Sequence, residues 1–214
     1  MKKILLIGGT GGLGTQLLGY LSDEYQCISV GSIDCDVTNE IKVKTFLESI
    51  DYDILIYLSV KNIDGQLHKQ SYYDVEKQLN VNITGFLNVL RHSTSKLRKK
   101  NYGRIIYISS ILSKKPLRGT GIYAASKAFC ENIIKTYSLE NSKYGITSNS
   151  IRLGYFAGGL IEHVPKEILD NIINTIPLKR LGNVNEMAGV VKTIIDNEYI
   201  NGTSISITGG YENK

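Results

Sequence analysis

A tyrosine and a lysine stand four residues apart in the segment GTGIYAASKAF, at Tyr123 and Lys127. Residues four apart lie on one face of a helix, and a nearby cation lowers the pKa of a phenol from its ordinary value of about 10. Such a pair could exchange a proton with a bound molecule. The spacing alone is weak evidence, because roughly one pair is expected by chance in a chain with 14 tyrosines.

A serine sets this pair apart from the other two Tyr-x-x-x-Lys pairs of the chain. Ser110 lies thirteen residues before Tyr123 and ends the strand-like run RIIYISS, residues 104–110. The pairs that begin at Tyr57 and Tyr73 have no serine at this distance. Because Ser110 ends a strand, we expect its hydroxyl to emerge at the carboxyl edge of a sheet, where the tyrosine can reach it.

A glycine-rich loop, GGTGGLG, follows directly on the first strand-like run, residues 3–8. Gly8 permits the tight turn out of the strand, Gly12 lets the backbone approach a pyrophosphate, and Gly14 lets the next helix pack closely on the sheet. A merely flexible turn is the alternative. The position between a strand and a helix favours a nucleotide-binding loop.

Strand-like and helix-like segments alternate along the chain. The strand-like runs are 3–8, 26–30, 53–60, 104–110, 146–152 and 204–208, with a weak candidate near 33–35. The helix-like segments are 12–23, 39–50, 73–100, 121–143, 162–175 and 184–197. This order predicts an α/β fold with a single doubly wound, Rossmann-type parallel sheet of about seven strands and helices on both faces. Such a sheet binds ligands at the carboxyl ends of its strands.

The composition is that of an ordinary soluble globular protein, with 42% hydrophobic and 21% charged residues in 214. We expect a single domain over residues 1–214 and no membrane span, because no apolar run is long enough. Three cysteines, at 27, 35 and 130, have no metal-type spacing and predict a reduced, cytoplasmic setting. The three histidines are scattered, so no metal site is expected.

The net charge of +5 is partly due to the run KLRKK, residues 96–100. A solvated helix C-terminus explains such a run, since cations there interact favourably with the helix dipole. Nucleic-acid binding is the alternative, and it is disfavoured because no basic repeat interleaved with aromatic residues accompanies the run.

Taken in order, the motifs resemble the classical short-chain dehydrogenase/reductase family, and in particular its members similar to 3-oxoacyl-acyl-carrier-protein reductases. The resemblance covers nearly the whole chain. It rests on the glycine loop, the Asn-x-x-Gly at Asn82, and the segments GRIIYISS, YAASKA, GITSNSI, IPLKRLG and INGTSISITGGY.

The resemblance implies a catalytic tetrad of Asn82, Ser110, Tyr123 and Lys127. Tyr123 would be the general acid in carbonyl reduction and the base in alcohol oxidation. Lys127 would lower the tyrosine pKa, together with the charge of an oxidised nicotinamide, and would hold the nicotinamide ribose. Ser110 would hydrogen-bond the substrate oxygen. Asn82 would hold a water of the proton relay through a distortion of its backbone.

The resemblance also implies a set of cofactor contacts. These are Gly8, Thr10, Gly11, Gly12, Leu13, Gly14, Ser32, Asp36, Val37, Ser59, Gly154 and Phe156, with Tyr123 and Lys127. Asp36 would contact adenine, although a helix N-terminal cluster with Thr38 and Asn39 is the alternative. Asn149 matches a position with a structural role.

The cofactor phosphate is a separate question. No carboxylate follows the second strand-like run before Asp34, which favours NADP(H) slightly over NAD(H), although no arginine lies nearby.

The chain departs from the family pattern in three places. The link between the second and third predicted strands is short and lacks its usual helix. The family's Asn-Asn-Ala-Gly is replaced by Tyr57-Leu58-Ser59-Val60. The family's Pro-Gly reads Leu153-Gly154, and a threonine that contacts the nicotinamide is replaced near Gly158. These changes bear on cofactor geometry more than on the proton chemistry.

The leading hypothesis is an NAD(P)-dependent oxidoreductase that transfers a hydride to or from a carbonyl or secondary alcohol, such as a 3-oxoacyl thioester or a sugar-linked ketone. A nucleotide-sugar epimerase or dehydratase and a non-catalytic dinucleotide sensor are the alternatives. We also expect a homotetramer, or failing that a dimer. Lys114, Lys115 and Arg118 border the expected site and would either attract an anionic handle of the substrate or merely solvate a loop.

Overall fold

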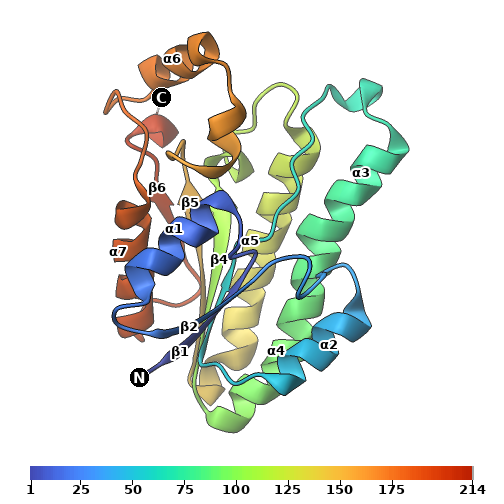
Figure 1. Ribbon diagram of the computed structural model, residues 1–214, viewed down its shortest axis with the longest axis vertical. Helices are drawn as coiled ribbons and strands as arrows, with labels where there is room; N and C mark the ends of the chain where they lie inside the picture. The colour runs from blue at the N-terminus through green and yellow to red at the C-terminus, as the bar shows by residue number, and fades with distance from the viewer. Residues whose placement is uncertain (214) are drawn as a thin grey trace.

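The computed structural model describes residues 1–213, except for the side chain of His163. Its centre is a parallel sheet of six strands in the order β2-β1-β3-β4-β5-β6 (Figure 1). The strands are β1 Lys3–Ile7, β2 Gln26–Val30, β3 Ile54–Tyr57, β4 Gly103–Ser110, β5 Ile146–Leu153 and β6 Ser204–Ile207. The prediction of a doubly wound α/β sheet is confirmed.

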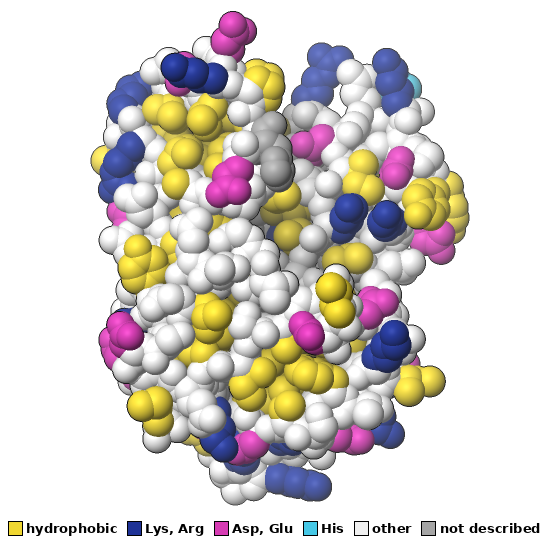
Figure 2. Space-filling model, in the orientation of Figure 1, with side chains coloured by type: hydrophobic (Ala, Val, Ile, Leu, Met, Phe, Trp, Pro, Cys, Tyr) yellow, Lys and Arg dark blue, Asp and Glu magenta, His cyan; other side chains and the backbone are white. Residues whose placement is uncertain are grey.

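Helices cover both faces of the sheet. One face carries α1 (Gly12–Leu21) and α7 (Val184–Asp196), and the other carries α2 (Glu40–Ser49), α4 (Gly85–Lys100) and α5 (Gly121–Asn141). The short helix α3 (Tyr72–Leu79) precedes α4, and α6 (Lys166–Thr175) lies at the end of the molecule where β4 and β5 finish (Figure 1). Figure 2 shows the surface hollowed at this end, between α6 and α3.

The alternation of side chains along each strand builds two separate cores. In β1, Leu5 and Ile7 pack with the helices α2, α4 and α5, whereas Ile4 and Leu6 pack with α1 and α7. All four side chains are almost completely buried, as expected for a parallel strand covered on both faces. Each contributes roughly 1.5–3 kcal/mol by leaving water.

The sheet has six strands and not about seven, because the weak candidate near 33–35 is a turn. The amide of Cys35 donates to Gly31 O over 2.9 Å, and the amide of Gly31 donates to the Asp34 carboxylate over 3.0 Å. This closed turn leaves no extended strand. The chain then enters α2 at Glu40 without an intervening helix, so the predicted absence of a helix after the second strand is confirmed, and β2 forms one edge of the sheet.

The basic run at residues 96–100 ties three elements together. Lys96 donates to the carbonyl oxygens of Leu47 and Ile50 at the end of α2. Lys100 forms ion pairs of 2.6 Å with Asp51 and 2.7 Å with Asp53, just before β3. The run is therefore bonded within the fold to a greater extent than a solvated helix terminus would be.

No helix within residues 1–213 is both long enough and apolar enough to cross a membrane.

Candidate active site

Helix α5 carries the predicted tyrosine and lysine on its buried face. Tyr123 is 8% exposed and Lys127 is 3% exposed, and both lie where α5 packs on β4 and β5. The helix begins just before Tyr123, with the amide of Ala124 donating to Thr120 O over 2.8 Å. The two side chains are therefore held in the first turns of a helix fixed by the sheet.

Lys127 is held between the helix and strand β4. Its Nζ donates to the main-chain oxygen of Ile108 over 2.7 Å and lies 4.8 Å from the centre of the Tyr107 ring. Burial lowers the pKa of Lys127 to about 8, while the charges of Cys130 and Glu131 raise it in part. The ammonium is thus close to losing its proton at mildly alkaline pH.

The predicted lowering of the Tyr123 pKa is not found in the protein alone. Burial raises the pKa of Tyr123 to about 12, and the charge of Asp64 raises it further, while a hydrogen bond with Ser110 lowers it. Lys127 is held by Ile108, and its Nζ lies 5.7 Å from the centre of the Tyr123 ring. Desolvation of the phenolate therefore dominates.

Ser110 is the last residue of β4, as the sequence predicts. Its hydroxyl accepts a hydrogen bond of 3.2 Å from the amide of Leu112, in the short 3-10 helix Ile111–Ser113. The side chain of Ser110 also lowers the pKa of Tyr123, which places the serine near the phenol at the carboxyl edge of the sheet.

Asn82 lies in a distorted stretch of helix. The predicted helix 73–100 is interrupted by a π-helical segment, Asn80–Thr84, between α3 and α4. The Asn82 amide group accepts from Lys61 N over 2.7 Å and donates to Lys61 O over 2.8 Å. Its Nδ2 also lies 3.2 Å from the hydroxyl of Ser126 on α5. Asn82 thus fastens the loop after β3 to the helix that carries Tyr123.

The glycine loop has the features of a phosphate cradle. Gly8 has φ +80, and a Cβ there would lie 2.5 Å from the backbone of Ser59, so only glycine fits. Gly11 caps α1 without a side-chain hydrogen bond, and Thr10 to Gly12 are exposed. Exposed backbone at a helix N-terminus suits an anion such as a pyrophosphate. These residues fit a dinucleotide.

Two further glycines of the loop, Gly12 and Gly14, are packed against the backbone of other residues. A Cβ on Gly12 would meet Gly159 N at 2.7 Å, so the loop after β5 lies directly against the glycine loop. A Cβ on Gly14 would meet Gly9 at 2.6 Å, which explains the tight entry into α1. Leu13 borders Gly159 as well.

The predicted adenosine contacts lie between β2 and α2. Asp36 accepts from the amide and the hydroxyl of Thr38 at 3.0 and 2.7 Å, and Asn39 caps α2 through the Lys42 amide. These hydrogen bonds are those of a helix N-terminal cluster, and the adenine contact of Asp36 stays a prediction. Ser32 is exposed, whereas Val37 is buried.

The remaining predicted contacts are at the ends of β3 and β5. Ser59 donates its amide to Ile7 O over 3.1 Å and lies beside Gly8. Gly154 packs on Thr208 and has no room for a side chain. The ring of Phe156 is buried against Gly182, so its side chain is part of the core.

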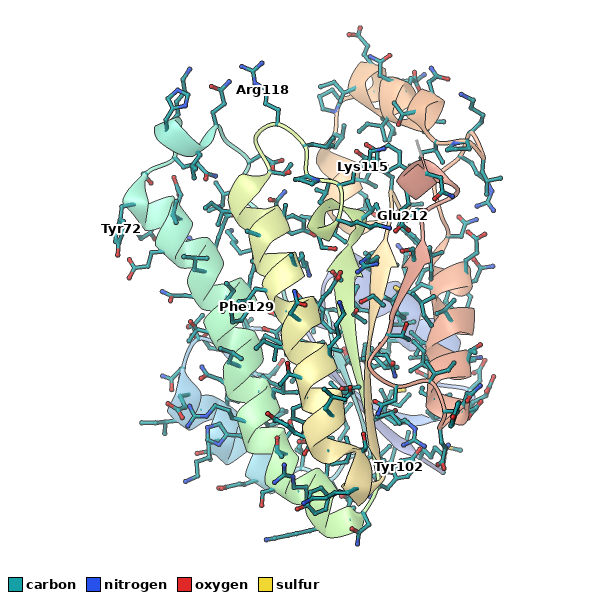
Figure 3. All side chains as sticks on the ribbon, turned by 180° about the vertical axis from the view of Figure 1, so that it is seen from behind. Tyr72, Tyr102, Lys115, Arg118, Phe129 and Glu212 are labelled. Carbon is teal, nitrogen blue, oxygen red and sulfur yellow. The ribbon has the colours of Figure 1, made fainter. Side chains whose placement is uncertain are left out.

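The loop between β4 and α5 is joined to the end of the chain. Lys114 forms an ion pair of 2.6 Å with Glu212, and Lys115 lies 5.2 Å over the ring of Tyr211. Figure 3 shows Lys115 and Glu212 close together and Arg118 at the tip of the loop. The loop contains no acidic residue, yet an acid from the C-terminal segment pairs with one of its three cations.

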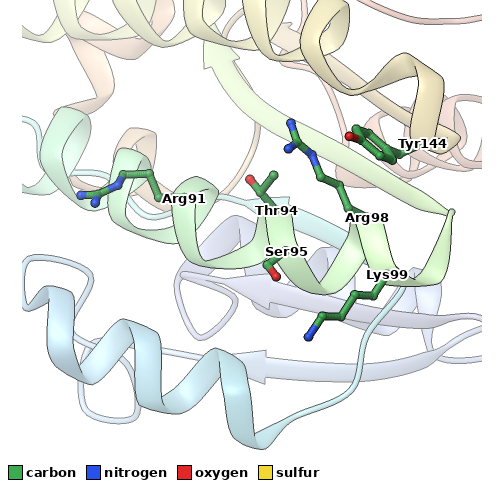
Figure 4. Close-up of a pocket in the computed structure, with 6 residues that line it drawn as sticks. All are labelled: Arg91, Thr94, Ser95, Arg98, Lys99 and Tyr144. Carbon is green, nitrogen blue, oxygen red and sulfur yellow. The ribbon is translucent and has the colours of Figure 1, made fainter.

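An open hollow lies elsewhere, on the outer side of α4 (Figure 4). It is an open groove of about 540 Å³ lined by Arg91, Thr94, Ser95, Arg98, Lys99 and Tyr144. None of the predicted site residues borders it, and its width alone does not make it a site. Within residues 1–213, no group of three or more His, Cys, Asp or Glu side chains is placed to hold a metal ion.

One buried group near the site is not among the site residues that the sequence predicts. Glu131, one turn after Lys127, pairs with Arg152 on β5 over 2.6 Å. The signal was available in the spacing, because Glu131 continues the series of every fourth residue that contains Tyr123 and Lys127.

The sheet, the glycine loop and the buried tyrosine–lysine helix together define a dinucleotide-binding α/β protein. A family model described as Enoyl-(Acyl carrier protein) reductase matches residues 15–212. The chain belongs to the short-chain dehydrogenase/reductase family, and it is an NAD(P)-dependent oxidoreductase.

Two curated relatives illustrate the match. The 3-oxoacyl-(acyl-carrier-protein) reductase MabA of Mycobacterium bovis is 26% identical, over 98% of this chain and 92% of the relative. The acetoacetyl-CoA reductase of Shinella zoogloeoides is 33% identical, over 85% of this chain and 76% of the relative.

The structure of ElxO with NADP bound superposes with a TM-score of 0.90, at 24% identity and with 100% and 99% of the two chains covered. At this identity, the structural similarity shows a shared fold and nothing more. The names of the curated relatives are those of reductases and dehydrogenases, which favours neither the epimerase nor the sensor alternative.

Proposed function

We propose that this protein reduces 3-oxoacyl thioesters with NADP(H), with Tyr123 as the proton donor. The observation that carries the proposal is the meeting of Ser110 and Tyr123 at the carboxyl edge of the sheet, with Lys127 one turn further along α5. The two curated relatives are named for 3-oxoacyl and acetoacetyl substrates, both carried as thioesters.

The bound nicotinamide supplies the hydride. Ser110 donates a hydrogen bond to the substrate carbonyl, and Tyr123 gives that oxygen its proton as negative charge develops there. Tyr123 is protonated at neutral pH, as a general acid in the reductive direction must be before it gives up its proton. In the oxidative direction, the charge of the oxidised nicotinamide favours the tyrosinate.

Lys127 can hold the nicotinamide ribose without leaving its present position. An ammonium has three N–H donors, and the bond to Ile108 uses one of them. The other two are left for the ribose hydroxyls. Asn82 keeps the loop after β3 in place through Lys61 and holds the water of the proton relay by its distorted backbone.

For the cofactor we propose NADP(H) with a small preference over NAD(H). The ElxO structure is titled with NADP bound, and the exposed Ser32 hydroxyl can bond a 2′-phosphate. The Asp34 carboxylate, which accepts from Gly31 N at the end of β2, acts against the phosphate and keeps the preference small.

Arg118 is the residue that we propose attracts the anionic part of the substrate. Acyl-carrier-protein and coenzyme A thioesters share a phosphopantetheine arm, which carries negative charge. Lys114 is paired with Glu212 and Lys115 lies over the ring of Tyr211, whereas Arg118 lies at the tip of the loop.

The proposal is tested by following NADPH oxidation at 340 nm with acetoacetyl-CoA, a simple 3-oxoacyl thioester. Turnover with this substrate, and its loss in Tyr123→Phe, is expected. Turnover that survives in Tyr123→Phe, or no reduction of acetoacetyl-CoA by the wild-type protein with either cofactor, would overturn the proposal.

A further inference from the structure

A buried carboxylate extends the catalytic face of helix α5. Glu131 follows Tyr123 by eight residues and Lys127 by four, so all three side chains point toward the sheet. Glu131 is only 4% exposed. A carboxylate is rarely buried to this extent unless it is paired and hydrogen-bonded, so its partners indicate what it does.

The first partners of Glu131 are two serines that bracket Ser110. Its Oε1 accepts hydrogen bonds of 2.6 Å from both Ser109 Oγ and Ser113 Oγ. Ser109 directly precedes Ser110 on β4, and Ser113 ends the short 3-10 helix after it. One carboxylate oxygen therefore holds both ends of the segment 109–113, and Ser110 lies inside that segment.

The second partner is Arg152 on β5. Its Nε lies 3.0 Å from each oxygen of Glu131, and its Nη2 lies 2.6 Å from Oε2. Arg152 is the register partner of Ser109 in the pairing of β4 with β5. The arginine thus fixes the orientation of the carboxylate from the neighbouring strand, and the network joins α5, β4, β5 and the turn after β4.

Stability alone is a poor explanation for this network. Burying an ion pair removes two charges from water, and well-packed apolar residues of similar size are often as stable or more stable. Hydrogen bonds to a charged group are, however, short and directional, and they define geometry well. The network lies where geometry matters, since the hydroxyl of Ser110 must meet the substrate oxygen beside Tyr123.

We infer that Glu131 is a positioning residue, which orients the segment 109–113 through Ser109 and Ser113 so that Ser110 is held beside Tyr123. The inference rests on the proposed function, because it requires Ser110 to bind the reacting oxygen.

The decisive variant is the double substitution Ser109→Ala/Ser113→Ala. It removes both serine donors to Oε1 and leaves the pair of Glu131 with Arg152 intact, so the buried charges stay compensated. We expect kcat for acetoacetyl-CoA to fall about tenfold, because small misplacements of a catalytic group lower rates by 10- to 100-fold. The Kd for NADPH, from fluorescence titration, should change less than about twofold.

Two further variants separate positioning from folding. Ser113→Thr keeps the hydroxyl and should keep kcat, whereas Ser113→Ala alone should lower it. Ser148→Ala is the matched control. Ser148 is a buried serine on the same face of β5 as Arg152, and its hydroxyl donates to Ile134 O on α5 over 2.8 Å, away from the site. Ser148→Ala should lower Tm about as much as Ser113→Ala does, and it should leave kcat unchanged.

The outcomes distinguish this inference from the proposed function. If Tyr123→Phe is inactive but the double serine variant has normal kcat, the inference is wrong and the proposed function stands. A loss of kcat that Ser113→Thr does not prevent, or that Ser148→Ala shares, would also overturn it. If Tyr123→Phe remains active, the proposed function fails, and this inference fails with it.

Should the double variant not fold, Ser109→Ala and Ser113→Ala are measured singly by the same criteria.

Discussion

Lys127 Nζ donates a hydrogen bond of 2.7 Å to the main-chain oxygen of Ile108, two residues before Ser110 on strand β4. The bond joins the helix that carries the proposed acid to the strand that carries the proposed substrate ligand. It also explains why the lysine is fully buried and yet well placed: an ammonium that would otherwise lie among aromatic rings has a carbonyl partner.

Tyr123→Phe should abolish most of the activity and little else. The substitution keeps the ring in its buried position and removes only the proton donor, so the rate of hydride transfer should fall by at least about 10²-fold. The Kd for NADPH should be unchanged. Lys127→Ala should weaken both turnover and cofactor binding. Stopped-flow rates and fluorescence titrations measure the two quantities, and equal losses of binding in both variants would contradict the assignment.

The pH profile of kcat/KM should have an alkaline limb near pH 8. Burial lowers the pKa of Lys127 from 10.5 to about 8, so the charged lysine is present below that pH and lost above it. The groups that face it are Tyr107, Tyr123, Cys130 and Glu131.

An arginine variant and a glutamine variant test this assignment. Lys127→Arg should remove the limb from whatever activity remains, because arginine keeps its charge throughout this range. Glu131→Gln should move the limb to lower pH, because the charge of Glu131 raises the Lys127 pKa. An unchanged limb in Lys127→Arg would assign the titration to another group.

Asp34→Asn should increase the preference for NADPH. The amide oxygen can still accept from Gly31 N, so the turn after β2 is kept while the negative charge is removed. The Kd for NADPH should fall about fivefold, which corresponds to the roughly 1 kcal/mol expected for one charge at a wet surface, and the Kd for NADH should barely change. Asp23→Asn, on an exposed turn before β2, is the control. Equal effects on both cofactors would place Asp34 away from the 2′-position.

Arg118→Ala should lower kcat/KM for acetoacetyl-CoA about threefold to tenfold and flatten its dependence on salt. The N-acetylcysteamine thioester of acetoacetate, which has no phosphate, should be affected much less. Salt screens such attraction over about 10 Å at 0.1 M, so the contrast should be largest in dilute buffer. Arg91→Ala, on the outer groove of α4, is the matched loss of one surface arginine. Equal losses of kcat/KM with both thioesters would show that Arg118 does not attract the phosphate-bearing part of the substrate.

We expect a tetramer, or failing that a dimer, in light scattering at micromolar concentration. The outer face of α5 exposes Phe129 (41%) and Leu139 (82%), and Figure 3 shows Phe129 on that face. A charged residue there should oppose association by placing an unpaired charge in an apolar contact. Leu139→Lys should therefore shift the mass toward the monomer, while Tyr199→Lys, at a still more exposed site after α7, should not. A monomeric wild type would refute this expectation.

The sequence predicts the sheet well because its information is local. The run from Ile4 to Ile7 indicates a doubly covered strand, and the glycines at 8 and 14 indicate a turn that no larger residue can make. The position of Ser110 at the end of β4 follows from the same pattern.

Contacts between distant segments do not follow from these local patterns. The pairing of Lys114 with Glu212 joins residues 98 positions apart, and no pattern in the sequence near Lys114 predicts it. The raised pKa of Tyr123 likewise depends on how completely the helix is buried. The predicted strand near 33–35 is part of a turn, because a few β-prone residues have the same pattern whether or not a neighbouring strand pairs with them.

The end of the sheet at β2 has a bearing on how the protein behaves in crowded solution. Within residues 1–213 no strand pairs with the outer side of β2. The backbone N–H and C=O groups on that side therefore have no partner strand. Such an edge is a template for strand addition and aggregation, and short length is one of the ways in which natural sheets limit that hazard. With five residues, from Gln26 to Val30, β2 offers only a brief template, and the closed turn that begins at Gly31 stops the edge from growing longer.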